Sequence, residues 1–272
     1  MRVLITGAYG FLGNLLYAHL ARSPERYEPY GLVRRLTPSV RADSVSITEI
    51  PESNLRMAEL SDFDAVRAAM DGIDVVVHLA ADPDPRSGWE PILNSNVVGT
   101  YNVFESARAA GVKRVVFAST NQVVFGYSSV PPYDLLIREQ FDDEALKDYE
   151  PIRHEWPTKP TTFYSCSKVF GEALAYMYSE THGMSSICLR IGWVLPEDKP
   201  RSRTVWSSQR DIVQMMERCI VAPDSLRFDV FFGQSDNEYN IVDIQHVRDV
   251  LGYEPQDGAP GASEEEQEPR RQ

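Results

Sequence analysis

The feature that most constrains the fold is a glycine-rich turn close to the start of the chain. A short apolar run at residues 3–5 leads into this turn, and a helical pattern of apolar residues follows it as far as about residue 23. A strand, three spaced glycines and a helix in this order are the context in which a chain binds a dinucleotide. Gly7 would allow the tight turn, Gly10 would let the backbone approach a pyrophosphate, and Gly13 would let the helix pack closely. The alternative is a glycine-rich turn that holds no ligand.

Strand-like and helical patterns alternate along the rest of the chain. We expect strands near residues 30–33, 45–50, 73–79, 115–118, 186–191 and 228–232, and helices near 63–70, 89–110, 161–182, 206–221 and 246–251. This alternation predicts an α/β fold of the Rossmann type, a doubly wound parallel sheet. Residues 1–190 would form the dinucleotide-binding domain including the catalytic helix, residues 191–255 a small substrate-binding part interleaved with it, and residues 256–272 a disordered tail. The irregular segment 121–163 is either a lid or specificity loop or a decoration.

Composition and charge exclude several classes of protein. A formal net charge of −13 over 272 residues argues against binding to nucleic acid or to an anionic membrane surface. No apolar run is long enough to span a membrane, and Met1 leads directly into a strand, which leaves no room for a signal peptide. Three unevenly spaced cysteines suit reduced thiols in a cytoplasm, and no cysteine–histidine cluster has the spacing of metal ligands, so we expect no metal.

Tyr164 and Lys168 are the strongest candidates for chemistry. Side chains four residues apart on a helix share one face, so the ammonium of Lys168 can lie near the phenol of Tyr164. A nearby positive charge favours the phenolate and creates a general base for the proton of an alcohol. Ser119 and Thr120 follow a buried strand, where the ligands of parallel sheets bind. Ordinary capping of a helix or turn is the alternative interpretation of these two hydroxyls.

The end of the second strand bears on the choice of cofactor. A carboxylate there would accept the 2′-hydroxyl of NAD, but Val33 is followed by Arg34 and Arg35. Arginine suits a 2′-phosphate, so the local chemistry favours NADP over NAD. Two solvated arginines at a strand end are the other interpretation.

Several short motifs recur in the order of a known family, and the chain resembles the extended short-chain dehydrogenase/reductases of the NAD-dependent epimerase/dehydratase family. They span residues 1 to about 195. The matching pieces are the three glycines, His78-Leu79-Ala80-Ala81, Asn96-Val97-Val98-Gly99-Thr100, Phe117-Ala118-Ser119-Thr120, the Tyr164/Lys168 pair and Leu189-Arg190-Ile191-Gly192.

The resemblance implies roles for the matched positions. Thr120 would hydrogen-bond the reacting oxygen, Tyr164 would be the acid and base, and Lys168 would hold the nicotinamide ribose. Glu59-Leu60 replaces the usual Asp-Leu at the adenine. The full set of implied cofactor contacts is Gly7, Tyr9, Gly10, Phe11, Leu12, Gly13, Arg34, Arg35, Glu59, Leu60, Leu79, Ala80, Ala81, Asn96, Ala118, Tyr164, Lys168 and Ile191.

The region after the catalytic helix is short for an enzyme that holds a sugar nucleotide. It is similar to the compact branch that contains uronate dehydrogenases and archaeal NAD-dependent glucose-6-phosphate dehydrogenases, which oxidise the anomeric carbon of a sugar to a lactone. Gln122 departs from their usual histidine, and Trp193 stands where uronate dehydrogenases have serine. The predicted substrate contacts are Asp82, Thr120, Asn121, Gln122, Tyr164, Trp193 and Arg201, the last for a carboxylate or phosphate.

Three alternatives to an NAD(P)-dependent sugar dehydrogenase remain open from the sequence. A sugar-nucleotide epimerase or dehydratase uses the same base, and an NADP-dependent carbonyl reductase of a non-sugar substrate fits Arg34, Arg35 and Trp193. A non-catalytic dinucleotide sensor is disfavoured because Thr120, Tyr164 and Lys168 are all present.

The helices at 89–110 and 161–182 also carry apolar residues on more than one face. One face would pack on the sheet and the surplus on a partner, which predicts a homodimer through these helices, as the family resemblance also implies.

Overall fold

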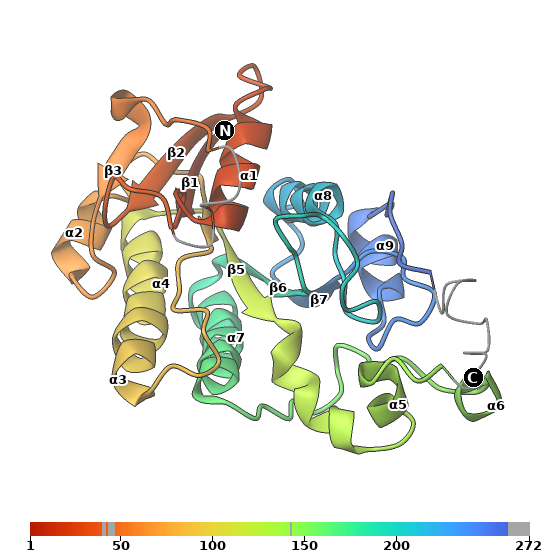
Figure 1. Cartoon of the computed structure of the whole chain (residues 1–272). Helices are drawn as coiled ribbons and strands as arrows, with labels where there is room; N and C mark the ends of the chain where they lie inside the picture. Colours follow the sequence, from red (N-terminus) through yellow and green to blue (C-terminus); the bar gives the residue numbers. More distant parts are fainter. Residues whose placement is uncertain (40–41, 43–46, 142, 261–272) are drawn as a thin grey trace.

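A single parallel β-sheet forms the centre of the molecule. The computed structural model describes residues 1–39, 42, 47–141 and 143–260, and within them the sheet has seven strands in the order β3-β2-β1-β4-β5-β6-β7. All neighbouring strands pair in parallel (Figure 1), and the expected Rossmann-type fold is therefore confirmed. The strands are β1 (Arg2–Thr6), β2 (Glu28–Val33), β3 (Leu55–Met57), β4 (Val75–His78), β5 (Arg114–Thr120), β6 (Ser185–Ile191) and β7 (Phe228–Gly233).

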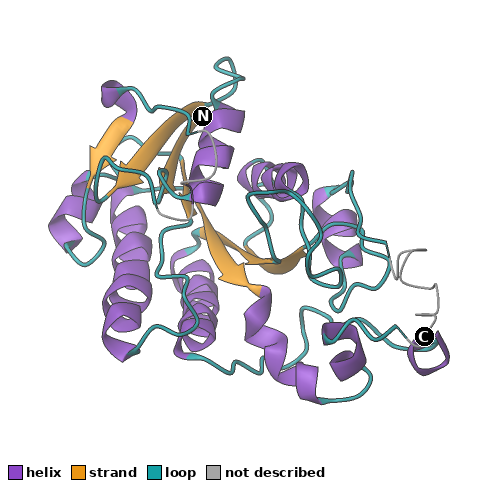
Figure 2. Cartoon of the chain, in the orientation of Figure 1, coloured by secondary structure: helices purple, strands orange, loops and turns teal. Residues whose placement is uncertain are grey.

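Helices cover both faces of the sheet, as Figure 2 shows. One face is packed by α1 (Phe11–Leu20), α8 (Gln209–Ile220) and α9 (Gln245–Leu251). The other is packed by α2 (Phe63–Ala68), α4 (Gly99–Ala110) and α7 (Phe163–His182). Successive side chains of β5 divide between these two cores, because neighbours along a strand point to opposite faces: Val115 and Phe117 contact the α4 and α7 side, Val116 and Ala118 the α1 and α8 side.

Two expected elements differ in the structure. Residues 47–50 of the strand expected at 45–50 are not in a strand, and residues 43–46 lie outside the described residues. The third strand is instead β3, which follows the short helix η2 (Glu52–Asn54) and pairs with β2 through Gly31, Leu32 and Val33. The helix expected at 89–110 is divided into α3 (Trp89–Ile92), a π-helical stretch η3 (Leu93–Val98) and α4. Apolar periodicity alone reveals neither difference, since both depend on packing.

The segment between β5 and α7 builds a third core of its own. It contains the 3₁₀ helix η4 (Asn121–Ser129), α5 (Tyr133–Ile137) and α6 (Asp143–Leu146). Its apolar side chains, such as Val123 and Leu136, pack with Val205, Phe232 and Val242 from the carboxyl-terminal part. Among the described residues of this segment, only Gln122 lines the main cavity, and most of the segment packs against the carboxyl-terminal part.

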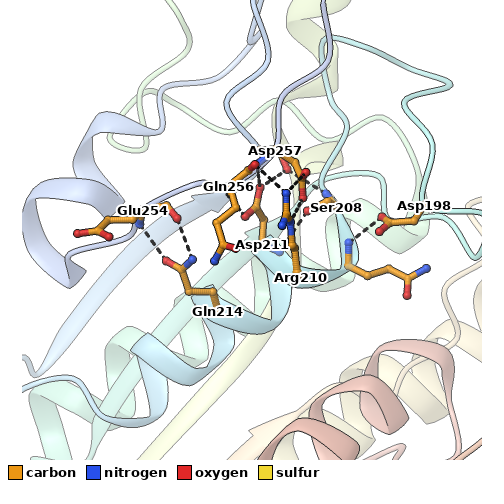
Figure 3. A network of polar contacts seen from close by, with 10 residues as sticks. Asp198, Ser208, Arg210, Asp211, Gln214, Glu254, Gln256 and Asp257 are labelled. Carbon is orange, nitrogen blue, oxygen red and sulfur yellow. Dashed lines mark hydrogen bonds and ion pairs between the residues drawn. The ribbon is translucent and has the colours of Figure 1, made fainter.

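Residues 256–260 follow α9 and are called the strap. The strap is held on α8 by one buried carboxylate. Asp211 is fully buried and accepts hydrogen bonds from Ser235 Oγ (2.7 Å) and from the backbone N–H groups of Gln256 (2.8 Å) and Asp257 (3.1 Å). Figure 3 shows the strap against Asp211 and Arg210, which pairs with Asp257. Gln256 and Asp257, where the expected disordered tail begins, are therefore bonded to α8, and residues 261–272 lie outside the described residues.

None of the helices in the described part of the chain combines the length and apolar character needed to cross a membrane.

Candidate active site

A large cleft lies beyond the carboxyl ends of the central strands. The sheet order reverses direction at β1, which pairs with β2 on one side and with β4 on the other. Ligands of open parallel sheets bind at such a reversal. The cleft here has a volume of about 1290 Å³ and runs from the end of β2, past the glycine turn, to the ends of β5 and β6. It is large enough for a dinucleotide and a small substrate together.

The glycine turn has the shape that a bound pyrophosphate requires. Gly7 adopts φ +71°, and a Cβ on Gly13 would lie 2.3 Å from the Gly7 carbonyl oxygen, so neither position accepts a larger residue without a shift. Gly10 is the N-cap of α1 and has no side chain to accept the first N–H groups of the helix. These N–H groups face the cleft lined by Gly10, Phe11 and Leu12 and suit an anionic group. The residues present therefore fit a dinucleotide.

At the other end of the cleft, α7 presents the predicted catalytic pair. Thr162 caps the helix through Ser165, which fixes the first turn, and Tyr164 lies within that turn. Tyr164 and Lys168 both line the cleft with Thr120, which ends β5. The Lys168 ammonium donates to the Ala118 carbonyl (2.7 Å) and lies 5.8 Å from the centre of the Tyr164 ring. Burial lowers the pKa of Lys168 from its ordinary value to about 8.

A buried chain of hydrogen bonds connects the first strand to the loop under the cleft. The Thr6 hydroxyl lies 2.8 Å from Nδ1 of His78 and accepts from the Ala80 amide (3.0 Å), while Nε2 of His78 lies 3.2 Å from Thr100 Oγ1. Burial, with a smaller effect of the Lys168 charge, lowers the pKa of His78 to about 3. His78 is therefore neutral, and it positions the Thr6 hydroxyl that holds the Ala80 amide.

A second buried network supports β5, the strand that ends at Thr120. Ser119 Oγ donates to Glu172 (2.6 Å), and Glu172 forms a bidentate ion pair with Arg190 of β6. Glu172 lies one turn beyond Lys168 on the same face of α7. The network therefore ties β5, β6 and the helix that carries Tyr164 to one another.

The end of β2 places both predicted arginines in the cleft. Arg34 and Arg35 line it together with Thr37 and Ser39, which we did not predict from the sequence. Glu59 and Leu60 also line the cleft, and a Cβ on Gly99 would lie 2.9 Å from the Leu60 Cβ, so α4 approaches here closely.

The remaining predicted cofactor contacts divide into two groups. All line the cleft except Asn96: Gly7, Tyr9, Gly10, Phe11, Leu12, Gly13, Arg34, Arg35, Glu59, Leu60, Leu79, Ala80, Ala81, Ala118, Tyr164, Lys168 and Ile191. Asn96 instead bonds the backbone of Asp82 through both ends of its amide (2.7 and 3.0 Å) and Ser167 Oγ (3.1 Å). Its side chain therefore ties the loop after β4 to α7.

The predicted substrate contacts also divide. Asp82, Thr120, Gln122, Tyr164 and Trp193 line the cleft. Asn121 is buried behind its wall, and Arg201 lies outside, with a side chain 68% exposed and paired with Glu197 (3.4 Å). In this structure Arg201 thus has an intramolecular partner, and its contact with substrate stays a prediction. No local sequence pattern indicates Ser95, Val194 or Leu195, which also line the cleft.

One group of potential metal ligands lies away from the cleft. His154, Asp229 and His246 are the group of this kind found among the described residues. The two imidazole rings are stacked 3.8 Å apart at 8°, so an ion cannot lie in the plane of both rings at once. Nε2 of His246 already pairs with Asp229 (2.9 Å), and this arrangement does not hold a metal without rotation of a ring.

Comparison with known proteins identifies the family. The model of the NAD dependent epimerase/dehydratase family matches residues 3–250. The chain belongs to this family. That assignment confirms the resemblance inferred from the sequence motifs.

Two curated relatives from Haloferax volcanii show the branch of the epimerase/dehydratase family. The chain is 33% identical to an NAD-dependent glucose-6-phosphate dehydrogenase, with 94% of each chain covered. It is 32% identical to an L-arabinose 1-dehydrogenase (NAD(P)(+)), with 95% of this chain and 97% of the relative covered.

Solved structures that resemble this chain also include dehydrogenases of sugar acids. The uronate dehydrogenase of Agrobacterium tumefaciens is 30% identical, with a TM-score of 0.72 over 95% of this chain and 85% of that one. A variant of that enzyme was solved in complex with NAD. The glucuronic acid dehydrogenase of Chromohalobacter salexigens is 29% identical, with a TM-score of 0.73 and the same coverage.

Proposed function

We propose that this protein is an NAD(P)-dependent dehydrogenase that oxidises the anomeric carbon of a sugar, a uronate or a sugar phosphate to a lactone. The observation that carries the proposal is the shared cleft: the glycine turn and the Tyr164, Lys168 and Thr120 side chains line one continuous surface. The relatives that match nearly the whole chain are dehydrogenases of sugars or sugar derivatives by name.

The mechanism follows from the positions of three side chains. Tyr164, as phenolate, takes the proton of the anomeric hydroxyl, and Thr120 hydrogen-bonds the same oxygen. Thr120 Oγ1 accepts a weak bond from the Gln122 amide (3.3 Å), so its own proton is available to the substrate. Lys168, anchored by Ala118, holds positive charge near the phenol. The bound nicotinamide supplies the acceptor for the C1 hydride.

For the cofactor, the residues at the end of β2 support the proposal that the enzyme accepts NADP at least as well as NAD. Arg34 and Arg35 line the cleft, Thr37 lies beside them, and no carboxylate occurs among residues 34–39. Arginine forms charge-assisted bonds with a phosphate, whereas NAD requires an acceptor for its 2′-hydroxyl. The L-arabinose 1-dehydrogenase relative carries NAD(P)(+) in its name, which supports a relaxed cofactor choice.

The proposal also includes a homodimer and a cytoplasmic location. Exposed large apolar side chains lie along α3, α4 and α7, among them Trp89, Tyr101, Phe163, Phe170 and Met177. Figure 1 shows α4 and α7 side by side, and the two helices contact each other. A partner copy would cover this apolar surface. The location stays a prediction from the three free cysteines and the composition.

A sugar-nucleotide epimerase or dehydratase is the less favoured candidate. The dTDP-glucose 4,6-dehydratase of Mycobacterium tuberculosis is 26% identical over 68% of this chain and 50% of its own length. A solved UDP-galactose 4-epimerase is 21% identical and supports the fold alone. Arg34, Arg35 and Trp193, which suit a carbonyl reductase of a non-sugar substrate, also line the cleft, but the relatives that match nearly the whole chain are sugar dehydrogenases by name.

Tyr164→Phe tests the proposed chemistry. With sugars, uronates and sugar phosphates as substrates, the wild-type enzyme should reduce NAD or NADP, and the variant should do so at least about a hundredfold more slowly. Its affinity for the cofactor, measured by fluorescence titration, should stay within about twofold, because the phenyl ring preserves the packing. Tyr176→Phe, at an exposed tyrosine of the same helix, is the matched control. Equal turnover by Tyr164→Phe would refute the assignment.

A further inference from the structure

Buried polar groups without partners gather at one place beside the cleft. Among the described residues, eleven buried side-chain nitrogen and oxygen atoms have no hydrogen-bond partner, and six of them belong to Asn121, Trp206, Ser207 and Gln234. Both amide atoms of Asn121 and of Gln234 are in this set, with the indole nitrogen of Trp206 and the hydroxyl of Ser207. We call these four residues the polar niche. Buried polar groups are otherwise almost always paired, so such a concentration needs a cause.

The register of the sheet explains why these groups lie together. Thr120 of β5 pairs with Ile191 of β6, and Ile191 pairs with Gly233 of β7. Asn121, Gly192 and Gln234 are therefore the next residues at the same edge of three adjacent strands. Because Asn121 directly follows Thr120, the niche begins one residue from the catalytic hydroxyl.

Gly192 borders both the cleft and the Gln234 side chain. Gly192 lines the cleft, and a Cβ built on it would lie 2.9 Å from the Gln234 Cγ and 2.6 Å from the Val205 carbonyl. A residue larger than glycine would thus collide with the Gln234 side chain and the Val205 carbonyl. Gln234 itself is fully buried.

The other two members of the niche are held against the same wall. The Trp193 amide donates to Val205 (2.8 Å), and the Ser207 amide donates to Trp193 (3.0 Å). The segment that carries Trp206 and Ser207 therefore runs alongside residues 192–196, which line the cleft with the exposed face of Trp193.

We propose that the polar niche binds the ring hydroxyls of the substrate and that the substrate is a neutral aldose. This inference rests on the proposed function and names its substrate class. Two amides, a hydroxyl and an indole N–H offer donors and acceptors but no charge, which matches neutral hydroxyl groups. A site that hydrogen-bonds such groups rejects analogues that lack them, because its polar atoms would stay unpaired.

The charges around the cleft agree with a neutral substrate. The cations that line the described part of the cleft are Arg34, Arg35 and Lys168. The two arginines lie at the end of β2, and Lys168 is held by the Ala118 carbonyl. Asp82 also lines the cleft, and its carboxylate would repel a uronate or a phosphate bound beside it.

Gln234→Met tests the niche with little change of volume. For the best neutral aldose among L-arabinose, D-galactose and D-glucose, we expect KM to rise about tenfold while kcat changes by less than about threefold. The melting temperature should stay equal or rise, because an unpaired buried amide is removed. Ser106→Ala, which removes an unpaired buried hydroxyl on α4, is the control and should leave KM unchanged. Ser207→Ala is a second variant in the niche and should raise KM by about threefold.

Two results would overturn the proposal. One is a KM within twofold of wild type in both Gln234→Met and Ser207→Ala, which would make the niche a structural feature. The other is a higher kcat/KM of the wild-type enzyme for D-glucuronate or D-glucose 6-phosphate than for every neutral aldose. A complete lack of cofactor reduction with all five compounds would be a different outcome, since it would reject the proposed function itself.

Discussion

Lys168 is a buried ammonium whose burial disfavours the charge that its proposed role requires. The residue is 4% exposed, and its ammonium has the Ala118 carbonyl as its hydrogen-bond acceptor, so burial disfavours its charged form. A residue placed only for stability would not carry this penalty. Its position near Tyr164 accounts for it, because positive charge at this point favours the phenolate.

The depressed pKa of Lys168 predicts how stability depends on pH. The pKa is 10.5 in the unfolded chain and about 8 in the folded protein, so the unfolded state binds more protons between these values. The unfolding free energy should therefore rise from pH 8 to 10.5, by about 3 kcal/mol relative to Lys168→Met. Below pH 8 the penalty is fully present. Urea unfolding of both proteins at pH 7, 8, 9 and 10 measures this, and parallel curves would contradict it.

Arg34 provides the residue-scale prediction for the cofactor. A charge-assisted contact with a 2′-phosphate contributes about 1.5–3 kcal/mol, which corresponds to a tenfold to hundredfold preference. Arg34→Ala should lower kcat/KM for NADP by that factor and leave the value for NAD within about twofold. Arg22→Ala, at an exposed arginine beyond the far end of α1, is the control. A strong NAD preference that the mutation leaves unchanged would show that the arginine has no role.

Among the elements, the strap after α9 is held in place by hydrogen bonds to a residue that is distant in the sequence. Its residues 256–260 have the Gly, Pro and charged composition of a disordered tail, yet Gln256 and Asp257 are bonded to Asp211, and Ala259 is buried. The acceptor lies about 45 residues earlier in the chain, so no local pattern reveals this order.

Asp211→Asn should destabilise the protein through the strap. The isosteric amide keeps one acceptor oxygen but turns an NH₂ group toward groups that donate, namely Ser235 Oγ and two backbone N–H groups. Leaving such buried donors unpaired costs about 1–3 kcal/mol, which lowers the melting temperature by several degrees in a chain of this size. Asp249→Asn, at an exposed carboxylate of α9, should change it by less than one degree. Equal effects of the two changes would show that the strap is not held in this way.

Local patterns can be predicted from the sequence, whereas contacts between distant residues cannot. The glycine turn, the Tyr164/Lys168 pair and Thr120 are local signals, since their spacing within one element determines the chemistry that they share. The strand β3 was misplaced because its pairing with β2 is a tertiary contact between short segments. Gln234 carried no signal, because its proximity to the cleft depends on the register of β5, β6 and β7 and on Gly192.

At the scale of the whole molecule, the apolar surface of α3, α4 and α7 predicts a homodimer. Tyr101 on α4 is 47% exposed and Phe163 on α7 is 53% exposed, although large apolar side chains are usually covered when they cluster. Tyr101→Glu should convert the dimer to a monomer at micromolar concentration, measured by light scattering. Met57→Glu, at an equally exposed apolar residue of the edge strand β3, should leave it dimeric. A monomeric wild-type protein would contradict the prediction.

The central claim is that the C1 hydride of a sugar is transferred to the nicotinamide, and deuterium transfer tests it most directly. The wild-type enzyme is incubated with a C1-deuterated aldose and NAD or NADP, and the reduced cofactor is analysed by mass spectrometry. The account predicts one deuterium per molecule of reduced cofactor, with one lactone or aldonate formed for each. Reduced cofactor without deuterium, or an epimerised sugar without net cofactor reduction, would contradict it.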